Sequence, residues 1–91
     1  MQDMQDSYSY VMAGRKGAKA GERKNLFGAK LKAFRLAQGI ALRDMAARLE
    51  AKGWEVSEGT WGHVEAGRRL LTDIELALAL KVLRRKFSDL D

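Results

Sequence analysis

Three glycines, Gly39, Gly53 and Gly67, divide most of this chain into segments whose apolar residues recur three and four positions apart. Residues with that spacing lie on one face of an α-helix, so each segment can bury a single apolar face. Glycine is common directly after a helix because it adopts the left-handed backbone conformation found there. The pattern predicts three helices, each followed by a glycine. Their expected bounds are residues 25–38, 42–52 and 58–66.

The residues expected to form the buried faces follow from the same spacing. They are Phe27, Leu31 and Phe34 in the first helix, Leu42, Met45, Ala46 and Leu49 in the second, and Trp61 and Val64 in the third. We expect Ser57 to cap the third helix, since a serine hydroxyl accepts a hydrogen bond from a free backbone amide at that position. Gly59 and Gly62 each weaken this helix by about 1 kcal/mol relative to alanine. Packing must therefore stabilise it.

A fourth helix begins at the clearest start signal in the chain, Thr72 followed three residues later by Glu75. These two residues form a capping box, in which each side chain bonds the backbone amide of the other. Apolar residues then continue at helical spacing, at Leu76, Leu80, Leu83, Phe87 and Leu90. The end of this series either extends beyond the core as a dimer contact or folds back onto it, with a fifth turn at residues 87–90. No strand candidate is present, so we expect a compact all-α bundle of four to five helices.

The charge balance is basic. The 91 residues include 17 Lys and Arg against 12 Asp and Glu, a net charge of +5. This balance favours a polyanionic partner, or serves solubility alone. Residues 1–24 lack helical spacing and hold the basic residues Arg15, Lys16, Lys19, Arg23 and Lys24. We interpret them as a flexible basic N-terminal arm before a domain at 25–91. The arm is either a solubilising tail or a segment that lies along phosphates or in the minor groove.

Several classes of protein are not indicated by this sequence. There is no cysteine, which excludes disulfides and fits a reducing cytoplasm. No apolar run approaches the roughly 20 residues of a membrane span, and the first residues lack the pattern of a secretory signal. The single histidine, His63, has neither a paired nucleophile nor metal-ligand spacing around it. We therefore expect no enzyme activity, no metal and no cofactor.

A set of motifs resembles one known family. They are Gly28-x-x-Leu31-Lys32-x-Phe34-Arg35, Gly39-Ile40, Met45-Ala46-x-x-Leu49, Val56-Ser57-x-x-Thr60-Trp61-x-x-Val64-Glu65-x-Gly67 and Asp73-Ile74-Glu75-Leu76. Their order and spacing are similar to the phage-repressor-like helix-turn-helix family, also called the XRE or Cro/C1 type. The resemblance covers about residues 26–90, with Glu65-Ala66-Gly67-Arg68 as its firmest local match.

The resemblance implies a lambda-repressor-like bundle that binds double-stranded operator DNA, usually as a homodimer. The second helix then lies across the DNA backbone and the third enters the major groove. The positions that match base contacts are Glu58, Gly59, Thr60 and His63. Those that match backbone contacts are Arg43, Ser57, Arg68 and Arg69. The family also implies an ion pair between Arg35 and Glu65.

Three features depart from the family pattern. The turn between the second and third helices is lengthened over residues 50–55 and contains Gly53-Trp54. Leu42 occupies the place where a polar residue often binds phosphate, and Arg43 is a candidate replacement. The base-contact set is poor in Arg, Asn and Gln, the residues that make two-pronged base contacts. We therefore expect specificity to depend partly on DNA shape and on partner proteins.

Together these features predict a cytoplasmic, sequence-specific DNA-binding regulator, most simply a dimeric repressor. The alternative is a protein-interaction module with the same fold, such as an antitoxin whose basic arm binds a toxin. The basic cluster Arg84-Arg85-Lys86 is open to two interpretations. It either complements the negative end of the last helix or contacts phosphate.

Overall fold

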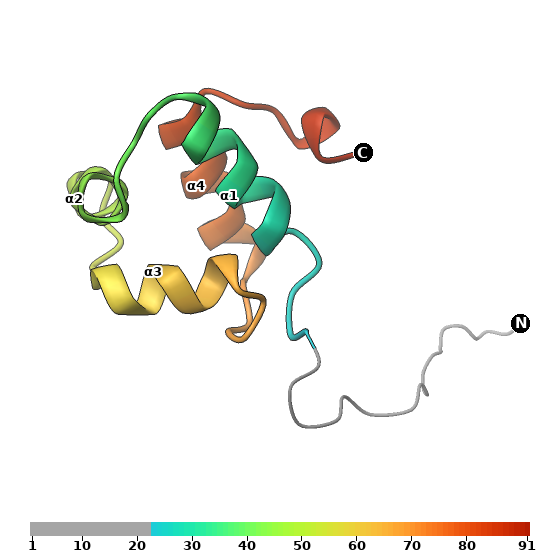
Figure 1. The fold of residues 1–91 in the computed structure, drawn as a ribbon, viewed down its shortest axis with the longest axis horizontal. Helices are drawn as coiled ribbons and strands as arrows, with labels where there is room; N and C mark the ends of the chain where they lie inside the picture. The colour runs from blue at the N-terminus through green and yellow to red at the C-terminus, as the bar shows by residue number, and fades with distance from the viewer. Residues whose placement is uncertain (1–22) are drawn as a thin grey trace, which may run out of the picture.

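The computed structural model describes residues 23–91, and all regular structure among them is helical (Figure 1). The elements are α1 (Gly28–Ala37), α2 (Leu42–Ala51), α3 (Glu58–Glu65), α4 (Asp73–Leu83) and the 3-10 turn η2 (Phe87–Leu90). The expected all-α class is confirmed for this part of the chain. The expectation of a flexible arm falls on residues that lie outside the described range, except for Arg23 and Lys24. Within residues 23–91, no helix has the length and apolarity that a membrane span requires.

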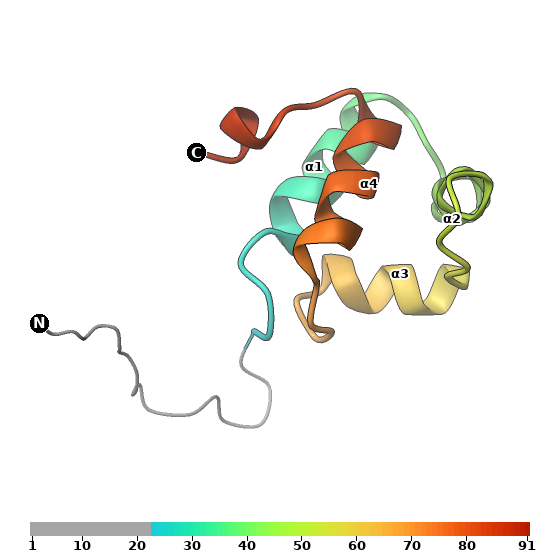
Figure 2. The same cartoon turned by 180° about the vertical axis from the view of Figure 1, so that it is seen from behind.

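The helices are arranged around one core. In Figures 1 and 2, α1 and α4 lie side by side, and α3 crosses the end of this pair at which both helices begin. The axis of α2 points toward the viewer beside them, and α2 packs against both α3 and α4. α3 thus contacts α1 and α2 along its inner side.

The core is formed by the apolar faces that helical spacing predicts. The largest of the almost completely buried side chains are Trp61, Leu31, Met45, Leu49, Leu83 and Val64. Trp61 is the largest of them and projects from α3, so packing holds this glycine-containing helix in place as expected. Phe27, Phe34 and Leu42 are only half-buried and pack at the edge of this cluster.

The start of α1 differs from the expectation. The helix begins at Gly28, three residues after Asn25. The Asn25 side chain forms hydrogen bonds with backbone amides at the start of the helix. Its Oδ1 accepts hydrogen bonds from the backbone amides of Phe27 (3.1 Å) and Gly28 (2.7 Å). Its Nδ2 donates to the carbonyls of Val64 (3.0 Å), in the last turn of α3, and of Arg69 (2.9 Å), beyond the helix. Asn25 therefore fastens the chain before α1 to the segment around the end of α3.

The other helix ends lie close to their expected positions. α1, α2 and α3 each stop one residue earlier than expected. Gly39, Gly53 and Gly67 have positive φ angles of 69°, 101° and 77°. Glycine is therefore favoured at these three places by the backbone conformation that ends each helix.

The C-terminal series of apolar residues does not form one continuous helix. Arg84 adopts a left-handed conformation, with φ of 57°, and ends α4 at Leu83. After this break, η2 returns Leu90 to the core, where it is 8% exposed, whereas Phe87 stays 56% exposed. The fold-back alternative is therefore confirmed for Leu90, and the extension of α4 past Leu83 is wrong. Arg84, Arg85 and Lys86 follow the helix and do not form its last turn.

Two glycines provide a matched test of the packing between α1 and α3. A Cβ on Gly28 would lie 2.2 Å from the Val64 carbonyl oxygen, whereas a Cβ on Gly62 would meet nothing within 4 Å. We expect Gly28→Ala to lower the free energy of unfolding by about 3 kcal/mol through overpacking. Gly62→Ala should raise it by about 0.5–1 kcal/mol through helix propensity. Urea unfolding followed by circular dichroism measures both, and equal effects would contradict the close approach of the two helices.

Candidate nucleic-acid interface

The outer face of α3 is polar and open. Glu58, Gly59 and His63 are exposed, and Thr60 is half-buried at the edge of the face. A Cβ built on Gly59 or Gly62 would meet none of the described atoms within 4 Å, apart from near neighbours in the chain. All four residues predicted to contact bases therefore lie within the first two turns of one accessible helix. A carboxylate, a hydroxyl and an imidazole are the groups that this face offers to a partner.

The N-cap of α3 agrees with the sequence prediction and fixes the Thr60 side chain. Ser57 Oγ accepts a hydrogen bond from the backbone amide of Thr60 at 3.0 Å. The same hydroxyl donates to Thr60 Oγ1 at 2.9 Å. The Thr60 hydroxyl thus has one acceptor site filled and keeps its own proton for a partner.

The inner face of α3 is held by a buried cluster of Arg35, Glu65 and Trp61, called here the Arg35–Glu65–Trp61 cluster. Arg35 Nε and Nη2 donate to Glu65 Oε2 and Oε1 at 2.6 Å and 3.1 Å. Trp61 Nε1 donates to Glu65 Oε2 at 2.6 Å. Arg35 Nη1 donates to the Ile40 carbonyl at 2.6 Å. The predicted ion pair is confirmed, and its bidentate geometry is the strongest available to a carboxylate.

This cluster determines which face of α3 points outward. Trp61 and Glu65 are one helical turn apart, so both project from the same side of α3. Because both are anchored in the core, the opposite side, with Gly59 and His63, must face away from it, and Glu58 is exposed because it is the first residue of the helix. The contribution of Trp61 to the ion pair was not foreseen, although the four-residue spacing of Trp61 and Glu65 is a signal that could have indicated it.

We expect the Arg35–Glu65–Trp61 cluster to dominate the stability of the fold. Arg35→Met or Glu65→Gln alone should lower the free energy of unfolding by about 3–5 kcal/mol, because each disrupts a buried, hydrogen-bonded ion pair. The double variant should cost less than the sum of the two single variants, a coupling that a double-mutant cycle measures. Trp61→Phe, which keeps most of the ring packing and loses one hydrogen bond, should cost about 1–3 kcal/mol. Additive single effects would show that the pair contributes nothing as a unit.

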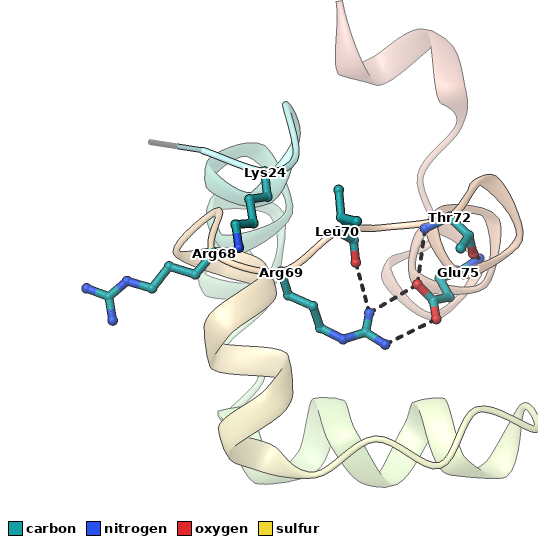
Figure 3. Close-up of a pocket in the computed structure, with 6 residues that line it drawn as sticks. All are labelled: Lys24, Arg68, Arg69, Leu70, Thr72 and Glu75. Carbon is teal, nitrogen blue, oxygen red and sulfur yellow. Dashed lines mark hydrogen bonds and ion pairs between the residues drawn. The ribbon is translucent and has the colours of Figure 1, made fainter. Parts of the chain in front are cut away.

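A second set of polar side chains surrounds an open cavity of about 410 Å³ between the end of α3 and the start of α4. Its lining residues are Lys24, Arg68, Arg69, Leu70, Thr72 and Glu75 (Figure 3). The two arginines at this cavity lie differently. Arg68 points away from the other side chains, whereas the Arg69 guanidinium is turned toward Glu75.

Arg69 is engaged within the protein. Its Nη1 donates to Glu75 Oε1 at 3.1 Å and to the Leu70 carbonyl at 3.0 Å, and Nη2 lies 3.4 Å from Glu75 Oε2. Its guanidinium carbon is also 5.5 Å from the ring centroid of Trp54, in the connection between α2 and α3. Trp54 in turn packs edge-on against Trp61, with 6.0 Å between ring centroids. Arg69 thus connects both segments that flank α3.

Lys24 also lines this cavity, a position that was not predicted from the sequence. Its backbone amide donates to the Gly67 carbonyl at 2.6 Å, which places its side chain beside Arg68 and Arg69. Arg23 packs over Gly67, where an added Cβ would lie 2.9 Å from its Cγ. No sequence spacing indicates this contact, because it joins residues on either side of three helices.

The remaining predicted contact residues are accessible. Arg43 is exposed in the first turn of α2, and Arg68 is exposed directly after α3. Within residues 23–91, neither side chain forms an ion pair. The structure therefore leaves Arg43 and Arg68 free to contact an anion and occupies Arg69 with Glu75. Among the same residues, no three His, Asp or Glu side chains are grouped so that they could hold a metal ion.

Glu75 lines this cavity, and its titration reports on its ion pair with Arg69. Burial alone would raise its pKa, but hydrogen bonds from Arg69 and from the Thr72 backbone, with the Arg69 charge, hold the pKa below its ordinary value of 4.5. A carboxylate whose pKa is lowered by folding stabilises the protein above its unfolded pKa. That contribution disappears as the pH falls through the lower, folded pKa.

The direction of this pKa shift predicts how the stability of a Glu75→Gln variant depends on pH. At pH 7 the variant should be less stable than the wild type, because it lacks the ionised partner of Arg69. The difference should shrink as the pH falls below about 4.5 and disappear once Glu75 is protonated in the folded protein. Urea unfolding over this pH range measures the difference. A gap that stays constant with pH would contradict the ion pair.

Comparison of the chain with protein-family models, with curated proteins and with solved structures finds no match. The functional inference therefore depends on the geometry of α3 and of the basic residues beside it.

Proposed function

We propose that this chain is a cytoplasmic, sequence-specific DNA-binding regulator of the phage-repressor-like type. In this proposal α2 and α3 are the helix-turn-helix and α3 enters the major groove. The observation that carries it is the contrast between the two sides of α3. One side is locked into the core by the Arg35–Glu65–Trp61 cluster, and the other is open and polar. An exposed α-helix of this kind fits the major groove, whose width matches a helix with its side chains.

The phosphate contacts are assigned to basic residues at both ends of the helix pair. Arg68 and Lys24 lie at the end of α3, and Arg43 lies at the start of α2. The amino end of α2 also favours an anion through its free amides, because Ala41 provides no side-chain cap. Ser57 adds an exposed hydroxyl at the start of α3. Arg69 acts as a positioning residue for the loop after α3, because Glu75 already neutralises much of its charge.

The base contacts are assigned to the first two turns of α3. Glu58 can accept a hydrogen bond from cytosine N4, and Thr60 and His63 can donate to guanine or to phosphate. Gly59 allows close backbone approach and has no side chain to distinguish bases. Two-pronged contacts from Arg, Asn or Gln are missing from this set. Sequence-dependent DNA shape therefore supplies part of the specificity.

The regulator is proposed to act as a dimeric repressor. Dimerisation would double the small interface that one α3 provides and would place two copies on successive turns of the duplex. Phe87, which is 56% exposed beside the C-terminus, remains a candidate for the contact between copies.

A second candidate function is an antitoxin-type module that mainly binds protein. It is favoured by two large apolar side chains, Leu70 in the loop before α4 and Ile74 in its first turn, which are 70% and 71% exposed. Such side chains offer apolar contact to a protein partner.

Selection of bound duplexes from a random DNA pool tests the proposed function directly. We expect enrichment of a partly palindromic motif whose half-sites lie about 10 base pairs apart. Pools that remain random, with binding that salt abolishes on all sequences alike, would overturn the sequence-specific claim. A protein that binds no duplex even at low salt would favour the antitoxin candidate.

Single substitutions at the cavity separate phosphate contacts from positioning. Arg68→Ala or Lys24→Ala should lower the slope of log K against log salt by about 1 unit each and weaken binding on all sequences alike. The matched control is Lys32→Ala, an exposed lysine of α1. It should leave the slope unchanged. Arg69→Ala should instead reduce the stability of the protein more than the salt slope. Quantitative gel shifts over a salt series, with parallel unfolding curves, provide both measurements.

A further inference from the structure

A second basic surface lies outside the proposed DNA interface. An open cavity of about 290 Å³ separates the carboxyl end of α2 from the carboxyl end of α4. Its lining residues are Arg48, Ala51, Lys52, Lys81, Val82 and Arg84, called here the basic groove. Four of the six are cationic, and none is acidic. The proposed function uses none of them, and only Arg84 was considered from the sequence as a phosphate contact.

The α4 side of the basic groove lies far from α3. In both views, α4 begins beside α3 and ends on the opposite side of the molecule (Figures 1 and 2). Lys81 and Arg84 belong to that far end. A duplex seated on the outer face of α3 would therefore leave the end of α4 accessible on its other side.

The helix ends account for only part of this charge. A helix carries about half a negative charge at its carboxyl end, so cations there are favourable. Two such ends supply about one negative charge against the four cations, which leaves about three positive charges uncompensated. Within residues 23–91, none of these four side chains forms an ion pair. The convergence of both helix ends on one cavity is a feature that the dipole of a single helix does not explain.

We propose that the basic groove binds an acidic segment of a partner protein, one that presents carboxylates together with apolar side chains. Arginine and lysine around a cavity provide charge-assisted hydrogen bonds to carboxylates. Ala51 and Val82 supply apolar contact between them, and Val82 is 8% exposed. A cavity of this volume admits a few side chains of a peptide, whereas the convex surface of a duplex cannot enter it. Both its charge and its shape therefore match a peptide.

The test uses a fluorescein-labelled peptide of glutamate and leucine, with a glutamine and leucine peptide of the same length as the neutral probe. Lys52→Gln combined with Lys81→Gln removes two charges from the basic groove. Lys32→Gln combined with Lys86→Gln removes two exposed charges outside the basic groove and is the matched control. We expect the groove variant to bind the acidic peptide about tenfold more weakly, which corresponds to the loss of two surface charge contacts. The control should bind within about twofold of the wild type, because screening limits distant charges.

Further measurements decide between this proposal and its competitors. Equal losses in the groove variant and in the control would show a net-charge effect and overturn it. Displacement of the peptide by a random-sequence duplex would show that the groove is part of a nucleic-acid surface and would also overturn it.

Sedimentation of the wild type and the groove variant examines self-association. An oligomer that the groove substitutions dissociate would identify a second copy as the occupant instead. Gel shifts of the groove variant should match the wild type, so failure of this proposal is distinguishable from failure of the proposed function.

Discussion

The fold depends on one buried ion pair and the hydrogen bonds that complete it. Removing a carboxylate and a guanidinium from water is costly, and their attraction offsets that cost only where the remaining polar atoms are also bonded. Here Glu65 accepts two bonds from Arg35 and one from Trp61, and Arg35 also donates to the Ile40 carbonyl. The cluster therefore ties together α1, the turn after it and α3. The orientation of α3 follows from this arrangement, and so does the placement of its open face.

Helical spacing was sufficient to predict the buried faces, because burial depends on which side of a helix a residue occupies. It predicted the helix ends less well, because individual side chains there form hydrogen bonds with backbone groups. Asn25 was predicted as the first residue of the first helix, yet its side-chain oxygen accepts from the Gly28 amide, and α1 begins only at Gly28. The same side chain donates to the carbonyls of Val64 and Arg69. The conformation of Arg84 likewise ends α4 without any glycine at that position. Contacts of this kind join distant parts of the chain, so no local pattern contains them.

The interface, too, was predicted only in part: its residues were identified, but the contacts among them were not. Arg68 and Arg69 are adjacent and chemically equal in the sequence, and the same role was predicted for both. The structure separates them, because the capping box of α4 presents Glu75 to Arg69 alone. The capping box was recognised from the sequence, but the loop conformation that brings Arg69 to it was not. The position of Lys24 beside Arg68 and Arg69, and the basic groove, were missed for a related reason, since each depends on how separate elements approach one another.

The attachment of Lys24 to Gly67 has a practical consequence for handling the protein. This hydrogen bond brings the chain before α1 alongside the end of α3, so Arg23 lies at the margin of the proposed DNA-binding surface. The opposite terminus is secured elsewhere, where Lys30 Nζ donates to the Asp91 carbonyl on the α1 side. A purification tag or fluorophore is therefore better placed after Asp91 than at the amino end.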